Sequence, residues 1–89
     1  MIHVNINVYG KVNNVGFRFL TMQYALKIGV TGFIMNAENG KLIIEAEGSK
    51  DAVDRFVKWC RNGPPGSFIS QISIEKAALK NFTTFDILP

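Results

Sequence analysis

The order in which two hydrophobic periods follow one another constrains the fold of this 89-residue chain more than any other feature. Apolar and polar residues first alternate, as in a strand with one buried face, and apolar residues then recur at helical spacing. We expect the strand to end at Gly10 and the helix at Gly29. The alternating apolar residues are Ile2, Val4, Ile6 and Val8, and those at helical spacing are Phe17, Leu20, Tyr24, Ala25 and Ile28.

Further strands are predicted on both sides of a second helix. Asn39-Gly40 joins two of them, and this dipeptide favours a tight hairpin because both turn positions need positive φ. The strands are expected at residues 30–36, 41–47, 68–75 and, as a short terminal one, 85–88.

The second helix has both a start signal and an apolar stripe. Ser49 is a suitable N-cap, and the stripe runs from Ala52 to Cys60. Its outer face predicts two i,i+4 ion pairs. They are Asp51–Arg55 and Asp54–Lys58.

This order of elements predicts an α+β fold, the ferredoxin-like split β-α-β sandwich, as a single domain over residues 1–89. We expect βαββαβ plus a short C-terminal strand, with an antiparallel sheet and two helices on one face. The right-handed crossover rule makes the first two strands parallel, with the third between them. Their carboxyl ends then share one sheet edge, which places the bend after Val8 and the strand end at Asn36 about 10 Å apart.

Composition limits the classes of partner. The net charge is +3, from ten basic and seven acidic residues with no run of three basic ones, which argues against a nucleic-acid surface and is compatible with a small anionic ligand. The single cysteine excludes an intramolecular disulfide and a thiolate metal site. No segment approaches the ~20 apolar residues of a membrane span, and the N-terminus lacks signal-peptide features. A cytoplasmic monomer is expected.

The bend from Gly10 to Gly16 has the composition of an anion-binding loop. Glycine and asparagine tolerate positive φ, and the first N–H groups of a helix have no internal partner. Arg18 follows in the first turn, where its guanidinium matches the oxygens of a phosphate. An ordinary strand-to-helix turn with an exposed arginine explains the same residues.

Two motifs favour the anion-binding loop over the ordinary turn. "GKVNNVGFR", residues 10–18, resembles the acylphosphatase signature Gly-x-Val-Gln-Gly-Val-x-Phe-Arg, and "GFIMN", residues 32–36, is similar to the family's second motif. Asn39-Gly40 stands where the family commonly has Asp-Gly. "GPP" at 63–65 and "FDI" at 85–87 extend the resemblance over nearly the whole chain.

The resemblance implies an enzyme that hydrolyses acyl phosphates, a small-molecule substrate class, to carboxylate and inorganic phosphate without metal or cofactor. Arg18 would bind the phosphate oxygens and Asn36 would orient the attacking water. The phosphate-binding loop would comprise Asn13, Asn14, Val15, Gly16, Phe17 and Arg18.

The chain departs from the family pattern at two loop positions. Asn13 replaces the expected Gln and is one methylene shorter, and Asn14 replaces the expected Gly. Asn tolerates positive φ at modest cost, and its side chain would either crowd the phosphate or donate an additional hydrogen bond to it. We expect activity to survive with altered affinity.

Other functions and residues receive simpler interpretations. A catalytically weak anion-binding module is the alternative, although intact Arg18 and Asn36 and a chain ending at Pro89 favour a free-standing enzyme. An RNA-binding domain of the same element order needs aromatic residues on the third strand, which is aliphatic and acidic here.

His3 is expected to be a solvated strand residue and Cys60 a core residue. Phe17, Tyr24 and Phe56 are further core candidates, and Trp59 is expected to cover the edge of the second helix's stripe.

Overall fold

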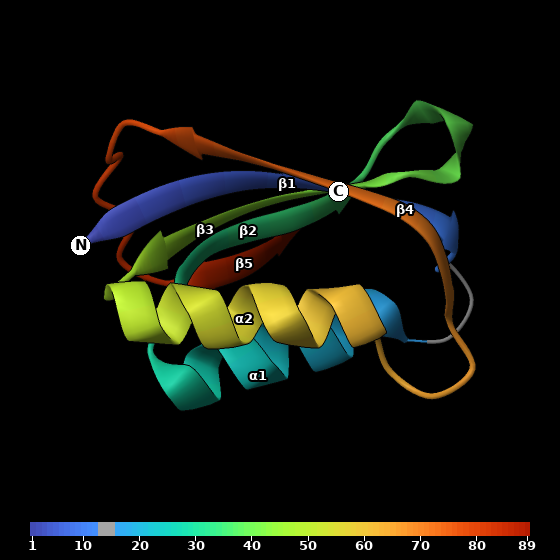
Figure 1. Ribbon diagram of the computed structural model, residues 1–89, viewed down its shortest axis with the longest axis horizontal. Coiled ribbons are helices and arrows are strands. Elements are labelled where there is room, and N and C mark those ends of the chain that lie inside the picture. Colours follow the sequence, from blue (N-terminus) through green and yellow to red (C-terminus); the bar gives the residue numbers. More distant parts are fainter. Residues whose placement is uncertain (13–15) are drawn as a thin grey trace.

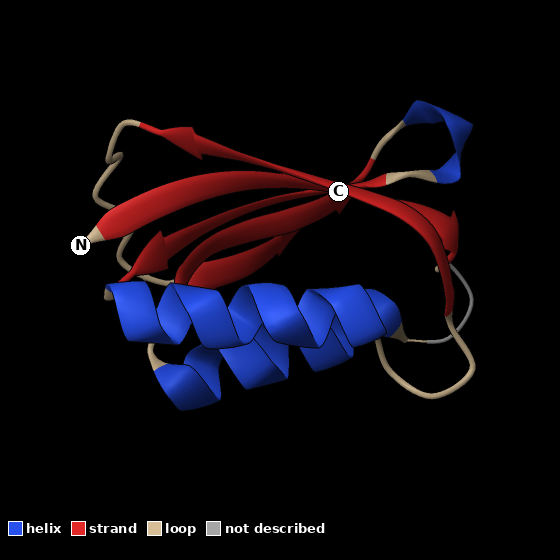
Figure 2. Ribbon diagram, in the orientation of Figure 1, coloured by secondary structure: helices blue, strands red, loops and turns tan. Residues whose placement is uncertain are grey.

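The computed structural model describes residues 1–12 and 16–89, which form a five-stranded sheet with two helices on one face (Figure 2). This is the predicted ferredoxin-like α+β arrangement. In chain order the elements are β1 (Ile2–Lys11), α1 (Phe17–Ile28), β2 (Thr31–Asn36), the 3-10 turn η1 (Glu38–Gly40), β3 (Leu42–Gly48), α2 (Lys50–Asn62), β4 (Phe68–Ala77) and β5 (Phe85–Leu88).

The strands lie in the order β4-β1-β3-β2-β5. β3 is antiparallel to both β1 and β2, as predicted, but β5 pairs parallel to β2, so the sheet is mixed rather than wholly antiparallel. The reason is the path of the chain: β4 runs back to the end of the sheet where β1 and β2 begin. The chain then crosses to the free edge of β2, and β5 can only run in the direction of β2.

The local signals for turns and caps are confirmed. Ser49 Oγ accepts a hydrogen bond from the Ala52 N–H at 3.1 Å, and Gly29 ends α1 in the left-handed region. Asn39 and Gly40 both have positive φ at the hairpin between β2 and β3.

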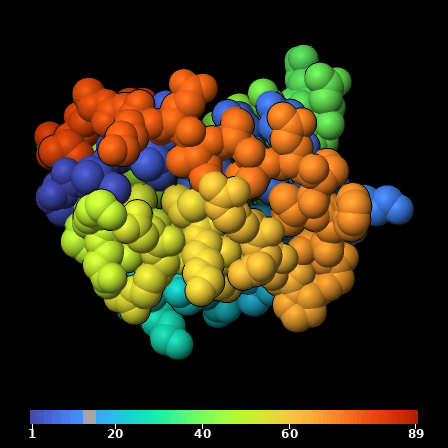
Figure 3. Space-filling view, in the orientation of Figure 1, coloured from blue at the N-terminus to red at the C-terminus, as the bar shows by residue number. Residues whose placement is uncertain are grey.

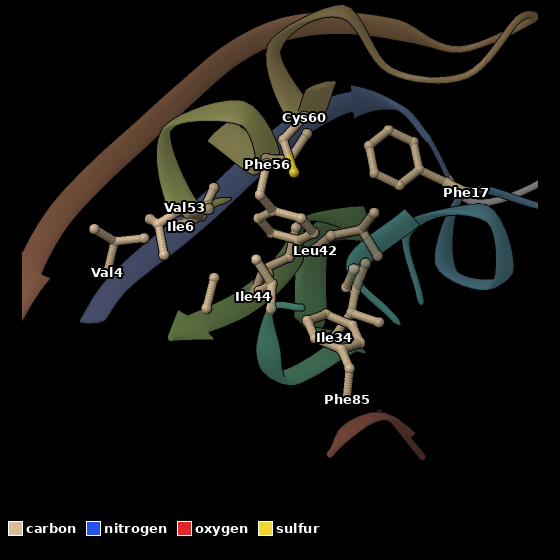
Figure 4. Close-up of a cluster of buried hydrophobic side chains, with 14 of the residues drawn as sticks. Val4, Ile6, Phe17, Ile34, Leu42, Ile44, Val53, Phe56, Cys60 and Phe85 are labelled. Carbon is tan, nitrogen blue, oxygen red and sulfur yellow. The ribbon is translucent and has the colours of Figure 1, made fainter. Parts of the chain in front are cut away.

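The core lies between the helices and the sheet (Figure 4). Phe56 of α2 points toward Leu42 and Ile44 of β3, and Cys60 is fully buried beside it.

On α1 the buried positions are Phe17, Thr21 and Ala25, so Thr21 takes the core place predicted for Leu20. Its hydroxyl donates to the Phe17 carbonyl at 2.7 Å, which satisfies the buried polar group. Trp59 stacks on Tyr24 and meets the edge of Phe17, as expected of a residue beside the stripe.

Two local details differ from the sequence predictions. β1 continues past Gly10 to Lys11, because a register shift between Tyr9 and Gly10 lets it keep pairing with β4. On α2, Asp54 pairs with Lys50 at 2.7 Å instead of with Lys58, whereas the Asp51–Arg55 pair forms at 3.2 Å. Figure 3 shows α2 and β4 side by side on one face of the molecule, with part of β1 between them.

The prediction of a solvated His3 is wrong. His3 is 1% exposed, and its Nδ1 lies 2.8 Å from Glu47 Oε2 on β3. The ring of Phe82 stacks on the imidazole at a centroid distance of 5.8 Å. The segment between β4 and β5 therefore covers a sheet face that the alternation pattern assigned to solvent.

Candidate active site

Two strand ends define one edge of the sheet. β1, β2 and β5 run in the same direction, toward the end of the sheet where α1 begins (Figure 1). Val8 and Asn36 both pair with Leu42, one from each side of β3. The separation is therefore two strand spacings, about 10 Å, as the sequence predicted. Asn36 is exposed at the last position of β2.

The position of Asn36 depends on a close approach between β2 and β3. Gly32 has φ of 141°, and a Cβ at this residue would overlap the carbonyl oxygen of Glu45. Glycine therefore permits the regular pairing that runs from Thr31–Glu47 to Asn36–Leu42. The second motif combines this requirement with the exposed amide four residues later.

The start of α1 presents the positive end of a helix. Gly16 has φ of 71° and precedes Phe17, and its carbonyl accepts the Leu20 N–H at 3.0 Å. Glycine has no side chain to cap the first N–H groups, and the first turn contains no acidic residue. These N–H groups have no partner within the helix, which makes the turn suited to an anion. Asn13, Asn14 and Val15, the other predicted loop residues, lie outside the described residues.

Arg18 is partly exposed and lines a surface hollow of about 190 Å³. The hollow lies between the first turn of α1 and β5, because residues of that turn and Ile87 of β5 line it. Ile87 pairs with Ile34 of β2, so the hollow lies on the helix-covered side of the sheet close to the strand that ends at Asn36. Phe19 and Ile87 were not singled out from the sequence; the position of Phe19 directly after Arg18 was the available signal.

The base of this turn is fixed by packing. Phe17 is 1% exposed, meets Trp59 of α2 at a ring distance of 5.9 Å, and accepts the Thr21 hydroxyl at its carbonyl. A buried anchor directly before Arg18 holds the backbone of the first turn against α2. The arginine therefore projects from a rigid support.

The charge of the hollow is simple. Arg18 is the one charged side chain among the described residues that line it.

Burial raises the pKa of the Cys60 thiol far above its ordinary value, and that residue lies in the core. His3 is near the start of β1, at the other end of the sheet. Across residues 1–12 and 16–89, no group of three or more His, Cys, Asp or Glu side chains is arranged to hold a metal ion. None of the helices in this part of the chain has the length and apolar character needed to cross a membrane.

Comparison with known proteins gives a consistent result. The family model described as Acylphosphatase matches residues 4–87. An acylphosphatase of Pseudothermotoga lettingae is 38% identical over 84 residues, which are 94% of each chain, and one of Aliivibrio fischeri is 40% identical over 89% of this chain and 88% of that one. The crystal structure of acylphosphatase from Bacillus subtilis superposes with a TM-score of 0.96 at 33% identity, covering all of both chains.

Proposed function

This chain belongs to the acylphosphatase family, and from that membership we propose how its own residues hydrolyse an acyl phosphate. The reaction cleaves the carboxyl-phosphate bond and yields a carboxylate and inorganic phosphate. A carboxylate is a good leaving group, so the main requirements are to hold the phosphoryl group, stabilise its charge and position a water.

The phosphoryl group binds at the start of α1. The guanidinium of Arg18 contacts phosphate oxygens as a planar fork, and backbone N–H groups of the loop from residue 13 to 18 supply further donors. Two features support this assignment: a helix N-terminus opened by Gly16 with no acid in its first turn, and Arg18 in the hollow beside it. Donors fixed before the reaction stabilise charge in the transition state without reorganisation.

Asn36 orients the water. Its side-chain oxygen accepts a hydrogen bond from the water, and its NH₂ group can donate to a phosphate oxygen. The water oxygen forms a bond to phosphorus while the bond from phosphorus to the carboxyl oxygen breaks. A phosphate oxygen receives the water's proton, so the mechanism uses no imidazole, thiol or carboxylate. The observation that carries the proposal is the register: one strand, β3, separates Asn36 from the bend after β1.

The same proposal covers the cellular location, oligomeric state, cofactor requirement and partners of the enzyme. We expect a cytoplasmic monomer that needs no cofactor, acts on a small-molecule acyl phosphate, and binds neither nucleic acid nor membrane. The phosphate site then consists of residues 13–18 with Asn36 opposite.

The position of water attack can be tested directly. The purified protein should hydrolyse benzoyl phosphate faster than buffer alone does. When the reaction is run in H₂¹⁸O, the label should appear in inorganic phosphate and not in benzoate. Label in benzoate would show attack at the carbonyl carbon and contradict the roles proposed for Arg18 and Asn36. A rate equal to that in buffer would favour the alternative, a catalytically weak anion-binding module.

A further inference from the structure

Phe19 is a large apolar residue on the surface next to the proposed phosphate site. It directly follows Arg18 in the first turn of α1 and is 53% exposed. Single exposed apolar residues are common and need no explanation, and Leu26 on the same helix is 54% exposed. Phe19 differs in its surroundings, because it lines the same hollow as Arg18 and Ile87.

The hollow therefore combines one cation with two apolar side chains. Phe19 and Ile87 come from different elements, α1 and β5, and line the same hollow as Arg18. Ile87 is held by its pairing with Ile34, which is fully buried, so this wall is part of the folded sheet rather than of a loop. An acyl phosphate has the matching chemistry, an anionic phosphate next to an acyl group.

The size of the hollow is suitable for a ring. Its volume is about 190 Å³. For comparison, an enclosed apolar cavity of about 150 Å³ holds a benzene molecule, whereas this hollow is open at the surface and would cover a ring on one side. An acetyl group, with one methyl carbon, would leave most of such a surface uncovered.

We propose that Phe19 and Ile87 contact the acyl group of the substrate and make the enzyme selective for acyl phosphates with an aryl or longer alkyl group over acetyl phosphate. This inference rests on the proposed function, since it needs the phosphate at Arg18. The contact removes apolar surface of both partners from water, and a hydrophobic site discriminates by the apolar surface that a substrate can bury in it.

The test compares kcat/KM for benzoyl phosphate and acetyl phosphate in four proteins: the parent, Phe19→Ala, Phe19→Leu and Leu26→Ala. In Phe19→Ala the ratio of the two kcat/KM values, benzoyl over acetyl, should fall about fivefold, which is about 1 kcal/mol at 1.4 kcal/mol per factor of ten. Phe19→Leu should restore part of the ratio. Leu26→Ala, which removes an equally exposed apolar residue of the same helix, should keep the parent ratio. Because an acyl contact is made in ground and transition states alike, the change should be mainly in the KM for benzoyl phosphate.

An unchanged ratio in Phe19→Ala, or an equal change in Leu26→Ala, would overturn the proposal. Arg18→Ala measured in parallel separates this from a failure of the proposed function. If Arg18→Ala loses activity on both substrates while Phe19→Ala keeps the parent ratio, the phosphate site stands and the acyl contact does not. If Arg18→Ala is fully active on both, the phosphate assignment fails, and the acyl contact fails with it.

Discussion

Val8 and Asn36 pair with the same residue, Leu42, from opposite sides of β3. Leu42 is fully buried, so the relationship is fixed within the sheet and does not depend on a loop. It places the exposed amide at the end of β2 two strand spacings from the segment of β1 that leads into the proposed phosphate-binding loop. In the proposed mechanism the phosphoryl group and the attacking water occupy the space between Asn36 and the bend that follows β1.

Replacing Asn36 with Ala should remove turnover and keep phosphate binding. The substitution removes the group proposed to orient water, so we expect kcat for benzoyl phosphate to fall by about 100-fold or more, as for other losses of positioning. The inhibition constant for inorganic phosphate should stay close to that of the parent. Asn62→Ala, at an exposed asparagine at the end of α2, is the matched control and should be active. Full activity in Asn36→Ala would exclude the proposed role.

Replacing Arg18 should affect binding and catalysis together. Loss of one preorganised hydrogen-bond donor to a developing charge typically costs about 10²- to 10³-fold, and we expect at least this decrease in kcat/KM for Arg18→Ala, with weaker inhibition by phosphate. Arg18→Lys should recover only part of it, because an ammonium cannot form the planar two-point contact. Arg61→Ala removes an exposed arginine from the last turn of α2 and should leave kcat/KM near the parent value. The assignment fails if Arg18→Ala retains the parent kcat/KM.

The Asn13-Asn14 pair is tested by restoring the family residues. We expect the parent to hydrolyse benzoyl phosphate faster than buffer, and the double variant Asn13→Gln, Asn14→Gly to differ mainly in KM. In the proposed loop, Gln would reach one methylene further than Asn13 and Gly would remove the side chain of Asn14, so we expect both changes to alter the affinity for substrate. A parent at the buffer rate beside an active double variant would show that these two residues prevent turnover.

Most of the features predicted correctly depend on neighbouring residues, and the buried position of His3 was missed because it depends on distant ones. Strand alternation, the Ser49 cap and the Asn39-Gly40 hairpin are local, and each is confirmed. The prediction for His3 was wrong because its hydrogen-bond partner Glu47 is 44 residues away in the sequence, and Phe82, whose ring stacks on the imidazole, is further still. In the candidate site, Arg18 and Asn36 follow from motifs, whereas Ile87 reaches the hollow only through the parallel pairing of β5.

The close approach of β2 and β3 predicts a severe effect for Gly32→Ala. The added Cβ would overlap the Glu45 carbonyl, and φ of 141° is strained for any other residue. We expect the free energy of unfolding to fall by about 3 kcal/mol or more. Gly29→Ala is the control, because Gly29 also has positive φ but open space around a Cβ, and should cost about 1–2 kcal/mol. Urea denaturation of both variants gives the comparison, and equal losses would show that the overlap contributes nothing.

Glu47 is a buried carboxylate that joins β3 to the segment before β5. It accepts the backbone N–H of Lys80 at 2.7 Å and that of Phe82 at 3.0 Å, and it lies 2.8 Å from His3 Nδ1. The Lys80 N–H is the largest cause of a pKa below the ordinary value of 4.5; burial acts in the opposite direction, and His3 and Phe82 lower the pKa further. Its partners therefore bind the ionised carboxylate better than the protonated form.

This arrangement predicts acid-sensitive stability. Because the pKa of Glu47 is lower in the folded state, its contribution is fully present above the ordinary value of 4.5 and is lost as the pH falls through the folded-state pKa. Glu47→Gln, which cannot ionise, should have a lower Tm than the parent at pH 6, and the difference should narrow as the pH falls below 4.5. Glu75→Gln, at an exposed position on β4, should follow the parent curve at every pH. Thermal unfolding followed by circular dichroism from pH 2 to pH 7 measures all three proteins, and a constant difference between parent and Glu47→Gln would contradict the linkage.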